Sequence, residues 1–222
     1  MSGRKLRVLK VILRWIYRNI WLKISPSVLE ELERTLNDCN TVLDVGCGSS
    51  SVIRSLKNKI YTIGIDAWQQ SINASKDKGI HDEYYTLDAL RIGNKFAENS
   101  FDSVIAWDLI EHLTKEEGYK LIAMMERIAR RRVIIYTPNG FLLQEEYDYN
   151  PWQVHKSGWT ASEMECLGYK VIGVSGWKPL RGKYSLVKWR PRRFWETISY
   201  LTEPFVRHRP TYAFQLMCVK NL

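Results

Sequence analysis

The stretch Thr41-Val-Leu-Asp-Val-Gly-Cys-Gly-Ser49 decides the fold. Apolar residues flank one acid, Asp44, and two glycines, Gly46 and Gly48, precede an apolar-periodic segment that begins at Val52. This pattern predicts a buried strand, a tight glycine turn and a helix over about residues 50–58. Glycine reaches backbone angles that other residues avoid, and without a Cβ it lets a ligand approach the main chain. Because ligands of open α/β sheets bind at the carboxyl ends of the strands, we expect this turn to line a binding crevice.

Two kinds of cofactor compete for this turn. A dinucleotide fingerprint, G-x-G-x-x-G, requires a third glycine where Ser51 stands, so that pattern is broken. Asp44 lies beside the expected ligand, where its charge repels phosphate and suits a cationic group. A second acid, Asp66, follows the next predicted strand, Ile60–Ile65. These residues favour a cationic cofactor over a dinucleotide.

The pattern D-x-G-x-G, with a second acid at the end of the next strand, resembles the class I S-adenosylmethionine-dependent methyltransferases. The run Asp108-Leu-Ile-Glu-His-Leu113 resembles the "EHL" segment of their small-molecule and quinone-type members. This resemblance implies an α/β, Rossmann-like fold with helices on both faces of a seven-stranded, mostly parallel sheet. The implied strand order is 3-2-1-4-5-7-6, with the last strand antiparallel. The implied cofactor is S-adenosylmethionine, and the implied product is S-adenosylhomocysteine.

The resemblance also places the cofactor contacts. It implies that Asp44 helps to hold the amino acid end, partly through water, and that Asp66 binds the ribose hydroxyls. Asp88, after a strand predicted near residues 83–87, is then expected to meet the adenine amino group, and Trp107 to lie near the methionine part. Trp68 either lies against the adenine or is a half-buried aromatic residue. The full predicted set is Asp44, Gly46, Cys47, Gly48, Asp66, Ala67, Trp68, Asp88, Ala89, Leu90 and Trp107.

Residues 137–159 follow the fifth predicted strand and are long for a loop, yet dense in aromatic and hydrogen-bonding side chains. Loops of this length are functional or disordered, and we predict a substrate lid. His155 is the first choice for a catalytic base, with a loop-holding bond to a backbone carbonyl as its alternative. Asp108 is a second catalytic candidate, able to orient cofactor or substrate. Glu111 and His112 are assigned a structural role in preference to a catalytic one. The predicted substrate contacts are Asn139, Gln144, Asn150 and Gln153.

The chain has 222 residues, of which 45% are hydrophobic, and this fits one α/β domain. Its four cysteines are widely spaced and form no C-x-x-C, which argues against a zinc site or a disulfide framework and fits a reducing compartment. No cluster of metal ligands is evident, so no metal is expected. The N-terminal apolar run is interrupted by arginines and has no signal-peptide cleavage site, so a cytoplasmic protein is expected.

The net charge of +9 is concentrated in two stretches. Residues 4–23 and 178–193 each hold seven basic residues and no acid, which points to anionic partners at specific places. Residues 1–26 are predicted to form a basic amphipathic helix, too short and too charged to span a bilayer. It either binds the inner face of the membrane or packs against the chain or a second copy. Residues 27–222 form the predicted methyltransferase domain, and residues 177–210 a basic, tryptophan-bearing insertion with a helix over about 194–206.

The predicted function is methyl transfer to a small-molecule or lipid-like acceptor, through oxygen. An amide-methylating N/D-P-P-Y/F motif is missing after the fourth strand, where Asp108 to Glu111 stand, and this disfavours methylation of exocyclic amines. Two alternatives stay open. The basic stretches can hold RNA by stacking and phosphate contacts, although nucleic acid is the less favoured partner. The chain can also bind the cofactor without catalysis, as a partner subunit.

Overall fold

The computed structural model describes residues 26–145, 150–182 and 185–222. Seven strands form one sheet in the order β3-β2-β1-β4-β5-β7-β6, as the sequence predicts. Strands β1 to β5 pair in parallel, whereas β7 runs antiparallel to both of its neighbours. The strands are β1 (Thr41–Val45), β2 (Tyr61–Asp66), β3 (Glu83–Thr86), β4 (Phe101–Trp107), β5 (Ala129–Pro138), β6 (Lys170–Trp177) and β7 (Ala213–Asn221).

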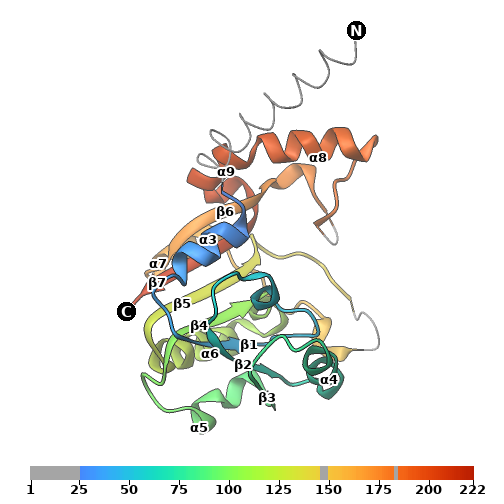
Figure 1. Cartoon of the computed structure of the whole chain (residues 1–222). Helices are drawn as coiled ribbons and strands as arrows, with labels where there is room; N and C mark the ends of the chain where they lie inside the picture. The colour runs from blue at the N-terminus through green and yellow to red at the C-terminus, as the bar shows by residue number, and fades with distance from the viewer. Residues whose placement is uncertain (1–25, 146–149, 183–184) are drawn as a thin grey trace, which may run out of the picture.

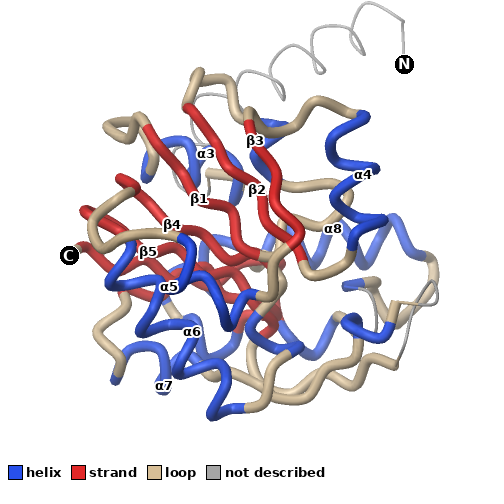
Figure 2. Tube along the Cα trace, turned by 90° about the horizontal axis from the view of Figure 1, so that it is seen from below, coloured by secondary structure: helices blue, strands red, loops and turns tan. Residues whose placement is uncertain are grey.

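Helices cover both faces of this sheet (Figures 1 and 2). They are α3 (Val28–Thr35), α4 (Gln69–Asp77), α5 (Ile92–Lys95), α6 (Lys115–Ile128), α7 (Ala161–Cys166), α8 (Arg192–Leu201) and α9 (Glu203–His208). Successive strand residues point to opposite faces, so Leu43 joins the core cluster that includes α6 and α7, whereas Val42 joins the cluster that includes α3. This alternation fixes the register of the strands whose ends carry the site.

Capping boxes begin three helices. Ser27, Thr114 and Thr160 each accept a hydrogen bond from a backbone N–H, and a glutamate three residues later bonds back to the cap. Ser and Thr are favoured at this position because their hydroxyl oxygen accepts from a backbone N–H that has no partner inside the helix. The cap at Thr114 begins α6 directly after the EHL segment, so it limits where that segment can lie.

Two predicted helices are corrected. In place of a helix over 50–58, one 3-10 turn, η2 (Val52–Ser55), follows the glycine turn, and Leu56 is extended with ψ of 139°. Its β-branched residues and Ser55 are weak helix formers, so no further turn is added. The predicted helix over 194–206 is two helices, α8 and α9, which meet at Thr202. Pro204 has no N–H to continue α8 and sits in the first turn of α9.

Some predicted segments lie outside the described residues. Residues 1–25, which are the predicted N-terminal helix without Pro26, lie outside the described residues. Residues 146–149 of the predicted lid and 183–184 of the insertion also lie outside them. Within the ranges that the structure describes, no helix is long and apolar enough to cross a membrane.

Candidate active site

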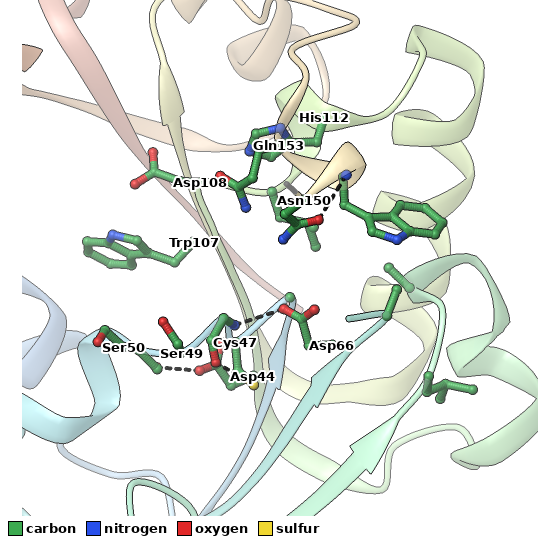
Figure 3. Close-up of a pocket in the computed structure, with 18 of the residues that line it drawn as sticks. Asp44, Cys47, Ser49, Ser50, Asp66, Trp107, Asp108, His112, Asn150 and Gln153 are labelled. Carbon is green, nitrogen blue, oxygen red and sulfur yellow. Dashed lines mark hydrogen bonds between the residues drawn. The ribbon is translucent and has the colours of Figure 1, made fainter. Parts of the chain in front are cut away.

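A cavity of about 290 Å³ opens at the carboxyl ends of β1, β2 and β4 (Figure 3). This volume lies at the lower end of the range for small-molecule pockets. Twelve predicted site residues line it: Asp44, Gly46, Cys47, Gly48, Asp66, Ala67, Asp88, Ala89, Trp107, Asp108, Asn150 and Gln153. Five other predicted site residues do not line it: Trp68, Leu90, Asn139, Gln144 and His155. The sequence analysis missed several lining residues, including Ser49, Ser50, Leu109 and Trp152.

The glycine turn has the backbone conformation that its sequence predicts. Gly46 has φ of +70° and Gly48 φ of +59°, the left-handed region that other residues avoid. A Cβ on Gly46 would lie 2.6 Å from Leu109 Cδ1, whereas one on Gly48 would meet no atom within 4 Å. The Gly48 N–H donates to Asp66 Oδ2 at 2.9 Å, and the Trp68 N–H donates to Oδ1 at 2.8 Å. Asp66 therefore ties the turn to the end of β2, while burial raises the pKa of its carboxyl group.

A buried histidine supports Asp44 and was missed from the sequence. Asp44 is 1% exposed, and its Oδ2 bonds both to His81 Nε2, at 2.9 Å, and to the Ser51 hydroxyl. The other carboxylate oxygen, Oδ1, is buried and has no partner among the described residues. The His81 ring packs on Gly64, where a Cβ would lie 2.7 Å from Nδ1. The sequence signal was Gly64 itself, because glycine inside a strand marks a close approach.

These features fit S-adenosylmethionine. The orphaned oxygen of Asp44 is an acceptor for an amine or for a bridging water. The open space beside Gly48 lets a ligand lie against the main chain, and Asp66 and Asp88 border the same cavity. These residues would hold the cofactor, which supplies a methyl group already activated on a cationic sulfur.

At the end of β4, Asp108 has φ of +49°, and its N–H donates to the Tyr136 carbonyl at 2.8 Å. Its side chain is open to solvent, yet it lies on the wall of a concave site. Loss of solvation in this concave site raises the pKa of Asp108 to about 7, whereas hydrogen bonds with Gln215 and Glu111 act to lower it. Gln215 in turn accepts from the Tyr136 hydroxyl at 2.8 Å, and the Tyr136 ring stacks on Trp107 with centroids 4.1 Å apart. This network fixes the end of the cavity opposite the glycine turn.

The side chains that the sequence analysis singled out in the described part of the predicted lid divide into two groups. Asn150 and Gln153 face the cavity from the turn η5 (Pro151–Gln153), which Asn150 caps through the Trp152 N–H (Figure 3). Asn139 instead donates from Nδ2 to three carbonyls at residues 210, 211 and 213, at 2.9 to 3.0 Å. Gln144 donates to the Gln153 carbonyl at 3.0 Å. Asn139 and Gln144 thus support the loop that carries the other two.

The loop is bonded to the EHL segment. The N–H groups of Lys156 and Ser157 donate to the Glu111 carbonyl, at 2.8 and 3.1 Å. His155 is buried and its Nδ1 lies 2.6 Å from the Leu142 carbonyl, the loop-holding bond considered as the alternative to a catalytic role. Burial lowers the pKa of His155. Burial, with neighbouring His155, also lowers the pKa of His112 to about 4, although nearby backbone carbonyls oppose this.

The fold and the crevice define a Rossmann-like α/β protein that binds its cofactor at the carboxyl edge of the sheet. Residues 43–137 match the family described as "Methyltransferase domain". These residues form a methyltransferase domain of the class I, S-adenosylmethionine-dependent kind, and its cofactor is S-adenosylmethionine. The predicted cofactor contacts, from Asp44 to Trp107, all lie inside the matched range.

Comparisons with known proteins agree with this fold. A phosphoethanolamine N-methyltransferase of Plasmodium falciparum is 28% identical over 129 residues, which are 57% of this chain and 45% of that protein. The chain thus spans about half the length of this curated relative. A S-adenosylmethionine-dependent methyltransferase from Archaeoglobus fulgidus is 18% identical with a TM-score of 0.55, covering 93% of this chain and 100% of its own. Magnesium protoporphyrin IX methyltransferase from Synechocystis, with bound S-adenosylhomocysteine, is 14% identical with a TM-score of 0.52, covering 96% and 99%.

Proposed function

We propose that this methyltransferase acts on an oxygen atom of a small-molecule or lipid-like acceptor. The observation that carries the proposal is the charge of the cavity wall. Although the net charge of the chain is +9, no Lys or Arg lines the cavity among the described residues. A polyphosphate or nucleic acid backbone needs such cations next to the reacting group. The acceptor end offers hydrogen-bonding groups instead, from Asp108, His112, Asn150 and Gln153.

In this proposal the chain's residues align the acceptor more than they activate it. A methyl group on a cationic sulfur needs a nucleophile held in line at near-attack distance, with water excluded. Asn150 and Gln153 orient the acceptor from the loop, and Asp108 accepts a hydrogen bond from the reacting hydroxyl or takes its proton. The curated relative is named for a small-molecule acceptor, which supports this size class and keeps nitrogen as the second candidate atom.

Cofactor binding is the first test. Calorimetric titration with S-adenosylmethionine is expected to give micromolar binding by the intact chain, lost in Asp66→Ala. Asp77→Ala is the matched control, because Asp77 is an exposed aspartate at the end of α4. Absence of binding by the folded, intact chain would overturn the proposal at its base.

The acceptor class is tested by transfer of a radiolabelled methyl group. Phospholipids, isoprenoid phenols, phosphoethanolamine and total RNA are offered in parallel. Label in an organic-extractable or small phenolic product supports the proposal. Label in phosphoethanolamine moves the reacting atom to nitrogen, and label in RNA contradicts the proposed acceptor class.

We also propose that the insertion binds an anionic lipid surface, where a lipid-like acceptor would be met. Arg190, Arg192 and Arg193 are exposed, and so are large apolar side chains of the same insertion: Trp177, Leu186, Trp189, Phe194, Leu201 and Phe205. In Figure 1, α8 lies beyond β6 at the outer edge of the molecule. Basic and aromatic side chains together suit the interface of an anionic bilayer.

Vesicle sedimentation tests this surface. The chain is expected to sediment with phosphatidylglycerol vesicles and not with phosphatidylcholine vesicles, and Phe194→Glu with Leu201→Glu is expected to abolish the effect. Leu222→Glu is the control, because Leu222 is an exposed leucine at the C-terminus. Equal sedimentation of the double variant and the control would contradict membrane binding by α8.

A further inference from the structure

Three potential metal ligands meet beside the cavity, which His112 lines, although their spacing in the sequence predicts no metal site. One ligand atom each from Glu111, His112 and His155 lies within 4.8 Å of the others. The two imidazole rings are 4.7 Å apart and nearly perpendicular. Glu111 and His112 follow β4, whereas His155 comes from the lid loop, so only the folded chain brings them together.

Backbone carbonyls orient both histidines. His112 Nδ1 lies 3.3 Å from the Val154 carbonyl, and His155 Nδ1 lies 2.6 Å from the Leu142 carbonyl. A carbonyl oxygen only accepts, so each Nδ1 carries the proton and donates it. This leaves Nε2 with its lone pair in both rings. Histidines that bind metals are held in the same way, by a hydrogen bond from the ring nitrogen that does not bind the metal.

Glu111 supplies a carboxylate that lacks a cation. It is 2% exposed, and its Oε2 accepts from the Thr137 hydroxyl at 3.0 Å. It forms no ion pair with any residue that the structure describes. Burial and the neighbouring Asp108 raise the pKa of Glu111, and a buried carboxyl group without a cation is neutralised by a proton or bound to a metal. A divalent ion between Glu111 and the two imidazoles would take the place of that proton.

We propose that Glu111, His112 and His155 bind one divalent first-row transition ion. Two imidazole nitrogens and one carboxylate oxygen suit Mn²⁺, Fe²⁺, Co²⁺ or Zn²⁺ better than Mg²⁺ or Ca²⁺, which prefer oxygen ligands. Three ligand atoms about 2.0 to 2.2 Å from one ion lie about 3.3 to 3.8 Å from one another, so the three side chains would move together by about 1 Å.

The ion has a defined place in the site. His112 lines the cavity, as Asp108 does, so an ion held by these three residues would lie at the cavity wall. There the ion would hold an acceptor oxygen beside the group that takes its proton. This role rests on the proposed function, whereas ion binding itself does not.

Binding is tested with Co²⁺ added to tag-free, chelator-treated chain, without cofactor or acceptor. The expected result is one saturable equivalent with a visible ligand-field band. Glu111→Gln, His112→Gln and His155→Gln are each expected to weaken binding by about tenfold or more. His208→Gln is the matched control, because His208 is exposed at the end of α9. No saturable binding by the intact chain, or the same affinity in all three variants, would overturn the site.

A second measurement covers variants that fail to fold, since His155 also holds the loop. In the intact chain, added Zn²⁺ is expected to shift the side-chain ¹⁵N signals of two of the four histidines, with His81 and His208 unchanged. Shifts confined to His208, or no shifts, contradict the site. Methyl transfer measured after chelation and after ion replacement then separates the two proposals. An ion that binds without affecting transfer removes the acceptor role and leaves the site.

Discussion

The two ends of the cavity are built in different ways. At the cofactor end, backbone conformation does most of the work, and Asp66 reaches Gly48 from the neighbouring strand. At the acceptor end, hydrogen bonds between residues far apart in the sequence hold the loop. Asn139, for example, donates to the backbone carbonyls of residues 210, 211 and 213. The comparison shows that a local sequence motif can identify a site that is formed by backbone conformation. A site that is formed by side chains from distant parts of the chain has no such motif. His81 is an exception, because this distant side chain supports Asp44 at the cofactor end. Replacing it is therefore the strongest test of the comparison.

Removing His81 is expected to have the largest effect. His81→Ala leaves Asp44 buried with only Ser51 as partner, and it opens a cavity over Gly64. Unfolding free energy should fall by about 3 kcal/mol, and cofactor binding should weaken with it. Urea denaturation and calorimetry measure the two effects. His208→Ala is the exposed control, and equal stability of both variants would show that the cofactor end is set by its local motif alone.

Asn139→Ala is expected to act on the acceptor end. It removes the donor from three carbonyls, and unfolding free energy should fall by about 2 kcal/mol. The KM for acceptor should rise while the Kd for cofactor stays the same, because Asn139 does not line the cavity. Asn73→Ala, at an exposed position of α4, serves as control. A change in cofactor Kd would contradict the division into two ends.

Trp159→Phe is expected to loosen the loop without emptying the core. Trp159 is fully buried against Gly118, and its Nε1 donates to the Ile110 carbonyl at 3.2 Å and to Ser157 at 3.1 Å. Loss of these bonds should cost about 1 kcal/mol. Hydrogen exchange should become faster at the N–H groups of Lys156 and Ser157, which bond to Glu111. Unchanged protection there would mean that the loop is held independently of Trp159.

Trp152→Ala is expected to have the smallest effect. Trp152 is 43% exposed and lines the cavity from the lid. Stability should change by less than about 0.5 kcal/mol, as for surface positions. A loss of about 0.5 kcal/mol in cofactor binding corresponds to a twofold to threefold rise in Kd. Calorimetry measures the Kd for the cofactor. A rise in Kd of more than tenfold would show that the lid contributes to cofactor binding as strongly as the glycine turn side of the cavity.

The fold was predictable from the sequence because its signals are local. The apolar residues of the strands and the acids at the strand ends each act within a few residues. The helix predicted over 50–58 was wrong because apolar spacing there reports burial on the sheet, whereas the propensities of the residues support one turn only. Pro204 was a visible break inside the helix predicted over 194–206, and its missing N–H explains the two shorter helices.

By itself, the sequence determined the glycine turn, because its backbone angles are ones that glycine adopts readily and other residues avoid. The strand order, which the structure confirms, and the cofactor contacts were implied by the resemblance to class I methyltransferases. The tertiary structure alone decided that His81 supports Asp44 and that Asn139 faces away from the cavity. It alone brought His155 onto the EHL segment. Each of these contacts joins residues far apart along the chain, and no local pattern encodes which buried donor will meet which buried acceptor.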